Sequence, residues 1–490
     1  MSILDQQLKS IRTSRKHVPD YLAPKQLPSL LFEATEAKDI DDNTIFEIGI
    51  NAIKNLIQFD KYFKKFQKDL FHESKRGFDR LRLSEKENLE LNMLIKDFLD
   101  HLSQFFMFET AHQCLEYLIR IFKINHFNTE ELVAFGFPFH QTKVFSRIIQ
   151  LCNLEDSRWE FFAPIQKEGA IFDRNSLVNR CIKTPWLINY ICELVKERVE
   201  NGISFPVLVS FYTNVLIEIF TLLFSNDIKV SQDSINTILT TIIPYLTFGL
   251  NYAPNFHSND EFQVATFMVI MKLSSLTQLS IEVTNTFIIL ITKWSLNQEK
   301  LKTKQTDALR CVIFLFQTQN SLLDFPKGSF DNLLKFDKLA KSIVKLNSQT
   351  HTQKCIHAIL KEMCSRILSA QSSQELDENM NFLEEIVYNI DMTKHAETFA
   401  NFLIKIYNEM PNSKSKPESE VNFQLGRSPS KSRSPSQKRK PTLLFEESGM
   451  DIESQIKPKQ TDSSGTTQNI ENPKNPIFAP LLRPTLSQSC

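Results

Sequence analysis

Histidine and cysteine are the side chains in this sequence that could hold a metal, and their spacing argues against it. His112, His126 and His140 stand fourteen residues apart within one apolar stretch. A lone histidine on a packed helix is usually a polar contact at a joint, so we interpret these three as structural. Cys355 and His357 are close in sequence, but two residues apart on a helix they diverge by ~200°. We therefore predict no metal site.

The motifs of common enzyme sites are also missing from the sequence. It contains no glycine-rich phosphate loop, no C-x-x-C or H-E-x-x-H zinc motif and no glycine-flanked serine nucleophile. The carboxylate pairs Glu130–Glu131 and Glu384–Glu385 are adjacent on expected helices, so their side chains point apart, as on a solvated face. We predict a non-enzymatic protein with no catalytic residue and no cofactor.

A basic run near the C-terminus, RSPSKSRSPSQKRK at 427–440, contains six basic residues and no acid. It could be a nuclear or nucleolar import signal or a nonspecific RNA contact; the alternative is a linker whose charges only keep it in solution. We favour a localisation role. The candidate localisation or RNA-contact residues are Arg427, Lys431, Arg433, Lys438, Arg439 and Lys440.

Two serines in this run, Ser428 and Ser434, each precede a proline. They are candidate sites of proline-directed phosphorylation. A phosphate adds negative charge, so modification would offset the basic charge of the run.

A second basic feature is a row of four lysines at helical spacing near the N-terminus. These are Lys61, Lys64, Lys65 and Lys68. On a helix over 61–71 they share one side, where they could contact RNA. We prefer the interpretation that they form a solvated face opposite Phe63, Phe66 and Leu70.

Helices must position these residues, and the stretch His101–Trp159 shows how they pack. Its pattern predicts one helix over 111–127 and another over 142–153, each apolar on two sides. Such helices lie between neighbours, whereas a surface helix has one apolar face. A corner with Gly136 and Pro138 joins the two. The pattern indicates a stack of helix pairs, an α-solenoid.

Composition agrees with an all-α fold. Only ten of 490 residues are glycine, well below the usual ~7%, whereas sheets and phosphate loops require many. Forty phenylalanines can fill a large core. The eight cysteines lack paired spacing and lie mostly in apolar helices, which indicates buried free thiols in a reducing compartment. The net charge is zero, so the composition as a whole gives no case for nucleic-acid binding.

The pattern predicts further helices along the chain. They span 42–57 with Asp42 or Asn43 as N-cap, 61–71, 84–106 with a capping box at Ser84, 157–167, 175–183, 186–200, 206–225, 231–249, 260–276, 280–296, 304–318, 329–347, 350–369, 374–391 and 394–409. Together they amount to nine or so pairs. Pro244 is expected to kink or divide its helix. The apolar stretch 205–224 is long enough to span a membrane, but Asn214 and Glu218 favour a buried solenoid helix, and we expect no membrane association.

Three parts follow from these patterns. Residues 1–27 are a flexible arm. Residues 28–410 form an α-solenoid of HEAT- or armadillo-like pairs. Residues 411–490 hold ten of the twenty prolines and form a disordered basic Pro/Ser-rich tail.

Three segments resemble the N-terminal region of the HEAT-repeat-containing protein 1 family, whose fungal counterpart is called U3 small nucleolar RNA-associated protein 10. They are LPSLLFEATEAKDIDDNTIFEIGINAIKNLI (27–57), HLSQFFMFETAHQCLEYLIRIFKINHFN (101–128) and PFHQTKVFSRIIQL (138–151). The similarity continues more weakly to about 350, where 231–347 resembles the family's internal N-terminal helical domain. Family members are several times longer. A truncated isoform, a partial gene model and one product of a divided protein all fit this difference.

The resemblance implies a scaffold of the small-subunit processome, in the nucleus and nucleolus. It implies pre-rRNA processing toward 18S rRNA, and a role in rDNA transcription by RNA polymerase I. The implied partners are WD40 propeller proteins of the same subcomplex, the 5′ external spacer of pre-rRNA and the U3 snoRNP. The alternative from another class is an α-solenoid nuclear transport or adaptor protein.

Overall fold

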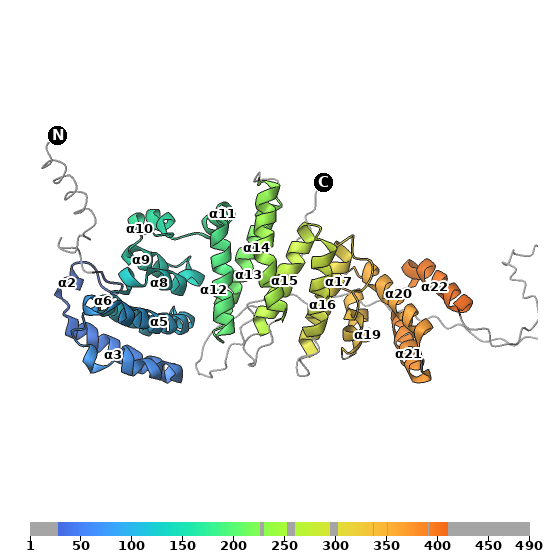
Figure 1. Cartoon of the computed structure of the whole chain (residues 1–490), viewed down its shortest axis with the longest axis horizontal. Coiled ribbons are helices and arrows are strands. Elements are labelled where there is room, and N and C mark those ends of the chain that lie inside the picture. Colours follow the sequence, from blue (N-terminus) through green and yellow to red (C-terminus); the bar gives the residue numbers. More distant parts are fainter. Residues whose placement is uncertain are drawn as a thin grey trace, which may run out of the picture. The chain divides into compact units, whose positions relative to one another are not determined.

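The computed structural model describes residues 28–409, apart from 156, 226–229, 252–259, 295–301, 337, 350 and 391 (Figure 1). The chain divides into two units, Met1–Ser413 and Lys414–Cys490. The expected arm at 1–27 and the tail at 411–490, with its basic and serine candidate residues, lie outside the described residues. Throughout the described part the elements are helices and turns, with no strand, which confirms the all-α prediction.

The N-terminal part is built of helices of unequal length and short 3₁₀ turns. They are α2 (Glu36–Asp39), α3 (Asp42–Phe59), η1 (Lys61–Lys65), α4 (Phe66–Asp69), η2 (Glu73–Lys75), η3 (Arg80–Arg82), α5 (Glu85–Leu102), η4 (Ser103–Phe105), α6 (Glu109–Phe122), α7 (Ile124–Phe127), α8 (Thr129–Gly136), η5 (Phe137–Phe139), α9 (Lys143–Leu151), η6 (Glu160–Phe162) and α10 (Ala163–Glu168). Helix α3 packs on α6, and α5 packs on α8. This part therefore departs from the regular succession of pairs that we expected over residues 28–410.

From α11 onward the helices alternate between two rows (Figure 1). Their bounds are α11 (Arg174–Lys183), α12 (Pro185–Glu200), α13 (Pro206–Leu223), α14 (Gln232–Asn251), α15 (Asp260–Leu276), α16 (Ile281–Trp294), α17 (Lys302–Thr318), α18 (Ser329–Leu334), α19 (Leu339–Asn347), α20 (Gln353–Ser369), α21 (Ser373–Asn389), η8 (Met392–His395) and α22 (Ala396–Glu409). One row runs α11, α13, α15, α17, α20, α22, each packed on the next. In the other row α12, α14, α16 and α18 pack in order, and α19 packs on α21. Such a double row is an α-solenoid, as predicted.

Helix α13 is long and apolar enough to cross a membrane by length and composition. It packs against α11, α12 and α15, and most of its apolar side chains are buried there. This position agrees with the expected solenoid helix. Its one acid, Glu218, lies near Arg174 with 3.7 Å between the carboxylate and the guanidinium.

The expected single helix over 111–127 is wrong, because the chain breaks at Lys123. This residue has φ 53° and ψ 41°, the left-handed conformation that ends helices. The buried Arg80 side chain donates to the carbonyl oxygen of Phe122 at 3.0 Å. A last-turn carbonyl that would otherwise lack a partner is thereby satisfied, and α7 starts afresh at Ile124.

Other boundaries also differ from the expected ranges. The helix expected over 329–347 is divided by Lys338, again left-handed, into α18 and α19. The helices expected over 61–71, 84–106 and 157–167 each contain a 3₁₀ segment. Conversely, α14 continues through Pro244. Pro244 and Thr240 are both exposed, so water can bond the Thr240 carbonyl that the proline leaves free.

Side-chain caps fix several helix starts. Ser84 and Glu87 form the predicted capping box at α5. At α3 the cap is Asp41, one residue earlier than expected: its carboxylate accepts from the Thr44 amide at 2.9 Å. Thr142 caps α9 in the same way.

Helices α3 and α6 approach so closely that only glycine fits at their contact. A Cβ added at Gly49 would lie 2.5 Å from Cγ of Tyr117, whose ring is fully buried. Gly49 has ordinary helical geometry, so space and not backbone conformation demands it. The hydroxyl of Tyr117 donates to the Leu70 carbonyl at 2.8 Å, which ties the ring in place.

We predict that Gly49→Ala lowers the free energy of unfolding by about 1–3 kcal/mol, the usual cost of overpacking a core. Urea denaturation of the purified chain measures it. Asn51→Ala, an exposed change on the same helix, is the control and is expected to stay within about 0.5 kcal/mol. Equal stability of both variants would contradict the close approach.

Candidate functional site

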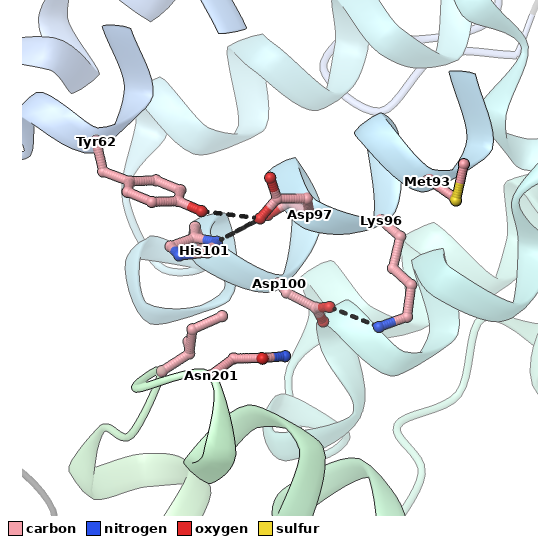
Figure 2. A pocket seen from close by; sticks show the side chains of 8 residues that line it. Tyr62, Met93, Lys96, Asp97, Asp100, His101 and Asn201 are labelled. Atoms are coloured by element: carbon pink, nitrogen blue, oxygen red, sulfur yellow. Dashed lines mark hydrogen bonds and ion pairs between the residues drawn. The ribbon is translucent and has the colours of Figure 1, made fainter. Parts of the chain in front are cut away.

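A pocket of about 320 Å³ lies where α5 meets η1 and the turn after α12 (Figure 2). Its lining is Tyr62, Met93, Lys96, Asp97, Asp100, His101, Asn201 and Ile203. The volume is at the lower end for small-molecule sites. Its chemistry depends on whether these charged groups are free or paired.

Asp97 is the centre of one set of contacts (Figure 2). It accepts from the Tyr62 hydroxyl at 3.0 Å and from the Lys65 ammonium at 2.6 Å. Nδ1 of His101 lies 3.2 Å from its carboxylate. The Tyr62 and His101 rings stack with centroids 3.7 Å apart. These contacts clamp η1 onto α5.

Asp100 is the centre of a second, more deeply buried set. One carboxylate oxygen accepts from Nε and Nη2 of Arg198 at 3.2 and 3.1 Å. The other accepts from Lys96 at 3.0 Å, and Lys96 also binds Glu197 at 2.7 Å. Arg198 is 1% exposed and further donates to the Ser103 hydroxyl and the Ala134 carbonyl. A buried guanidinium is tolerated only when its donors are satisfied in this way.

The charged side chains that line the pocket are therefore paired with one another or with neighbouring residues. Asp97 and His101 resemble two members of a catalytic triad, but no serine or cysteine lines the pocket to act as nucleophile. Within the described residues no group of three His, Cys, Asp or Glu side chains could hold a metal ion.

The predicted lysine row near the N-terminus is only partly free. Lys61, Lys64 and Lys68 are exposed, whereas Lys65 is engaged by Asp97. The apolar residues expected on the opposite side, Phe63, Phe66 and Leu70, are each fully buried. This geometry fits a solvated face, and a contact of the row with RNA stays a prediction.

The three equally spaced histidines do not converge. Nε2 of His112 lies 2.7 Å from the Phe106 carbonyl, and Nδ1 of His140 lies 3.2 Å from the Phe137 carbonyl. Both are polar contacts at helix joints, as predicted. His126 is exposed. On α20, Cys355 is buried and His357 exposed, so these two diverge as expected.

Seven cysteines, all except Cys490, fall in the described part, and each is buried and free. Burial raises the pKa of Cys152, Cys181 and Cys355 to about 12. A thiol reacts as its thiolate, so these sulfur atoms are inert at neutral pH.

Sequence patterns did not reveal the buried ionic groups. Besides Arg198, Arg80 is fully buried, and burial lowers its pKa to about 10, which leaves it charged at neutral pH. Glu116 is also fully buried and accepts from the Ser29 hydroxyl and the Leu30 amide at 2.9 and 2.6 Å. Glu116 stands in an otherwise apolar stretch, which is a signal of a buried charge but does not name the partner, whereas Arg80 and Arg198 stand among other charged residues and give no such signal.

Comparison with known proteins gives a consistent result. The model of the family U3 small nucleolar RNA-associated protein 10 matches residues 238–363. HEAT repeat-containing protein 1 of Homo sapiens is 26% identical over 77% of this chain and 17% of its own length. The homolog of Dictyostelium discoideum is 26% identical over 85% of this chain and 17% of its own. U3 small nucleolar RNA-associated protein 10 of Schizosaccharomyces pombe is 25% identical over 71% of this chain and 20% of its own length.

These matches confirm the resemblance seen in the sequence motifs. They also show that the chain spans about a fifth of the length of these curated relatives.

We expect Arg198→Met to lower the free energy of unfolding by about 3–5 kcal/mol, because it leaves the Asp100 carboxylate buried with Lys96 as its only cation. Chemical denaturation measures the change. The double variant Asp100→Asn/Arg198→Met removes the stranded charge and is expected to recover part of the loss. The single variant Asp100→Asn completes the cycle. If the double variant loses as much stability as the two single variants added together, the pair is not coupled.

His140 predicts a pH dependence of stability. Burial and the nearby Arg174 lower its pKa from 6.5 to about 4, and its Nε2 has no hydrogen-bond partner among the described residues. Between these values the unfolded chain binds the proton and the folded chain does not, so stability is complete above pH 6.5 and is lost as pH falls toward 4.

By this linkage, acidification from pH 7.5 to 5 is expected to remove about 2 kcal/mol through His140 alone. The measurement is denaturation of the parent chain and of His140→Gln at both pH values. The variant should lose less stability on acidification than the parent. Equal losses would show that His140 is protonated in the folded chain.

Proposed function

Because the chain is related to the HEAT repeat-containing protein 1 family, we propose that it is a non-catalytic scaffold in ribosome biogenesis. The observation that carries the proposal is the match of the U3 small nucleolar RNA-associated protein 10 model to residues 238–363. These residues fall within helices α14 to α20 of the double row. The finer proposal is membership of the small-subunit processome, in pre-rRNA processing toward 18S rRNA.

The packing of the chain supports a binding role over a chemical one. Successive layers of a solenoid present an extended surface, on which affinity comes from shape and from a few anchor residues. The charged groups of the pocket at α5 are already paired with each other, so they are suited to rigidity and recognition. The relatives' names favour this proposal over a nuclear transport adaptor.

Partners and location follow as parts of the same proposal. We propose that the chain works in the nucleus and nucleolus with WD40 propeller proteins, the U3 snoRNP and the 5′ external spacer of pre-rRNA. Support for transcription of rDNA by RNA polymerase I would be a further role of the same assembly. Each of these is expected of a scaffold that joins a large ribonucleoprotein early.

Crosslinking and immunoprecipitation of the tagged chain, with sequencing of the bound RNA, tests the proposal. Enrichment of 5′ external spacer sequence together with a nucleolar signal is the expected result. A diffuse signal without pre-rRNA would contradict it for this chain.

The basic tail gives a separate prediction. Replacing its six basic residues by glutamine, at 427, 431, 433, 438, 439 and 440, is expected to shift the tagged chain from the nucleus to the cytoplasm. The physical reason is that import receptors read clustered positive charge. Ser428→Glu/Ser434→Glu should shift it partly and Ser428→Ala/Ser434→Ala not at all. Unchanged nuclear accumulation of the glutamine variant would make the run a mere linker.

A further inference from the structure

An irregular segment that leads into α3 is held onto the helices behind it largely through its backbone. We call this segment the strap: residues 28–40. Only two of its side chains are buried, those of Ser29 and Ala37, and both are small. Three apolar side chains of the strap are half-buried against the core: Leu30, Phe32 and Ile40. Side-chain packing is therefore only part of what holds the strap in place.

The centre of the attachment is Glu116 on α6, whose side chain is fully buried. Its carboxylate accepts from the Ser29 hydroxyl at 2.9 Å and from the amides of Leu30 and Leu31 at 2.6 and 3.3 Å. The Ser29 hydroxyl oxygen also accepts from the Phe32 amide at 3.0 Å, which bends the strap. We call this bend the serine turn. Successive amides that face one side form a nest for an anion, and here the anion is the Glu116 carboxylate.

Two arginines bind carbonyl groups of the strap. Arg147 of α9 donates to the Ser29 carbonyl at 2.9 Å. Arg120 of α6 donates to the carbonyls of Ala37 and Ile40, each at 3.1 Å. We call the three charged side chains the cradle: Glu116, Arg120 and Arg147. Apart from the Ser29 hydroxyl, the cradle binds main-chain atoms of the strap, which a segment of almost any sequence can present.

This mode of attachment differs from that of the helices beneath the strap. A segment that only completes the core is held mainly by buried apolar side chains, as α3 is against α6. Ala37 is the only fully buried apolar side chain of the strap, so the strap should open at a lower free energy than these helices. Opening takes hydrogen-bond partners from the charged groups of the cradle, which is costly. Another segment that offers the same contacts would relieve this cost.

We propose that the cradle is a peptide-binding site for a serine turn, and that the strap occupies it as an intramolecular competitor of a segment from a partner protein. The contacts define the class of ligand. It is a non-helical segment with a serine at the position of Ser29, two amides directly after it and a small residue at the position of Ala37. Neither the helical rows nor the proposed role in ribosome biogenesis is needed for this site to work.

A labelled peptide of residues 27–41, added to the full chain, tests the site. Two variants are designed to open the strap. Leu30→Pro removes the amide that lies 2.6 Å from the Glu116 carboxylate, and Ser29→Asp places a second carboxylate against it. Fluorescence anisotropy measures binding of the peptide. Both variants should bind it at least about tenfold more tightly than the parent, in which the tethered strap competes at a high effective concentration.

Three controls isolate the cradle. Glu33→Pro changes an exposed strap residue whose amide does not bind Glu116, and this variant should bind the peptide no better than the parent. A peptide with alanine in place of Ser29 should bind the opened variants about tenfold more weakly, because it lacks a donor to a charged group. Adding Glu116→Gln to Leu30→Pro should weaken binding by a similar factor.

Hydrogen exchange of the parent chain measures opening without any substitution. The amides of Leu30 and Leu31 should exchange with solvent well before the central amides of α6. Exchange as slow as that of α6 would show that the strap does not open separately from the helices, and would overturn the proposal.

Two binding results would also overturn it. If neither opened variant binds the peptide more tightly than the parent does, the strap does not compete for the cradle. If the alanine peptide or a scrambled peptide binds as tightly as the original, the cradle does not recognise the serine turn. Crosslinking of the chain to pre-rRNA in cells is independent of all three measurements, so failure here is distinct from failure of the scaffold proposal.

Discussion

The buried salt bridge between Arg198 and Asp100 joins the N-terminal part of the fold to the rows of helices that follow. It connects residues 98 positions apart, and the same guanidinium reaches the Ser103 hydroxyl and the Ala134 carbonyl. Elements α5, η4 and α8 are therefore held by one side chain of α12. Helix α12 is the first member of its row and packs on α14, which in turn packs on α16. Desolvating both ions is costly, and it is offset only because these partners are all in place.

The N-terminal part is packed differently from the two rows of helices that follow. Its short helices do not follow one another in regular pairs, and aromatic side chains fill the irregular space between them. The ring of Phe98 contacts those of Phe63, Phe66 and Phe71, at centroid distances of 5.0 to 5.7 Å. Such contacts are directional, which favours one arrangement over many. The buried Glu116 adds a further constraint, because its carboxylate holds the backbone at Leu30 against α6.

Local pattern in the sequence was sufficient for the fold class and for the approximate position of most helices. Two-sided apolar helices predicted the stack, and the spacing of Ser84 and Glu87 predicted the start of α5. Breaks at Lys123 and Lys338 were missed, because lysine is no specific signal for a left-handed residue; tertiary partners such as Arg80 decide the matter. Pro244 does not divide α14, for a related reason: whether a proline divides a helix depends on whether the carbonyl it frees faces water.

The candidate surfaces were harder to predict than the helices. Spacing alone showed that Lys61, Lys64 and Lys68 share a side, but not that Asp97 would engage Lys65. Pairing over long sequence separations is a property of the fold and is not written into local spacing.

The seven buried thiols can report where the stack of helices begins to unfold. They lie on α6, α11, α12, α17 and α20 and in the turn after α9, so each of these stages contains a sulfur that is shielded while the layer is closed, whereas α13 to α16 contain none. In a structure whose layers touch only their neighbours, unfolding can begin at an end or in the middle and spread from there. The rate at which each thiol becomes alkylated would record where opening begins. The thiols therefore report separately on the opening of the five helices and the turn that contain them.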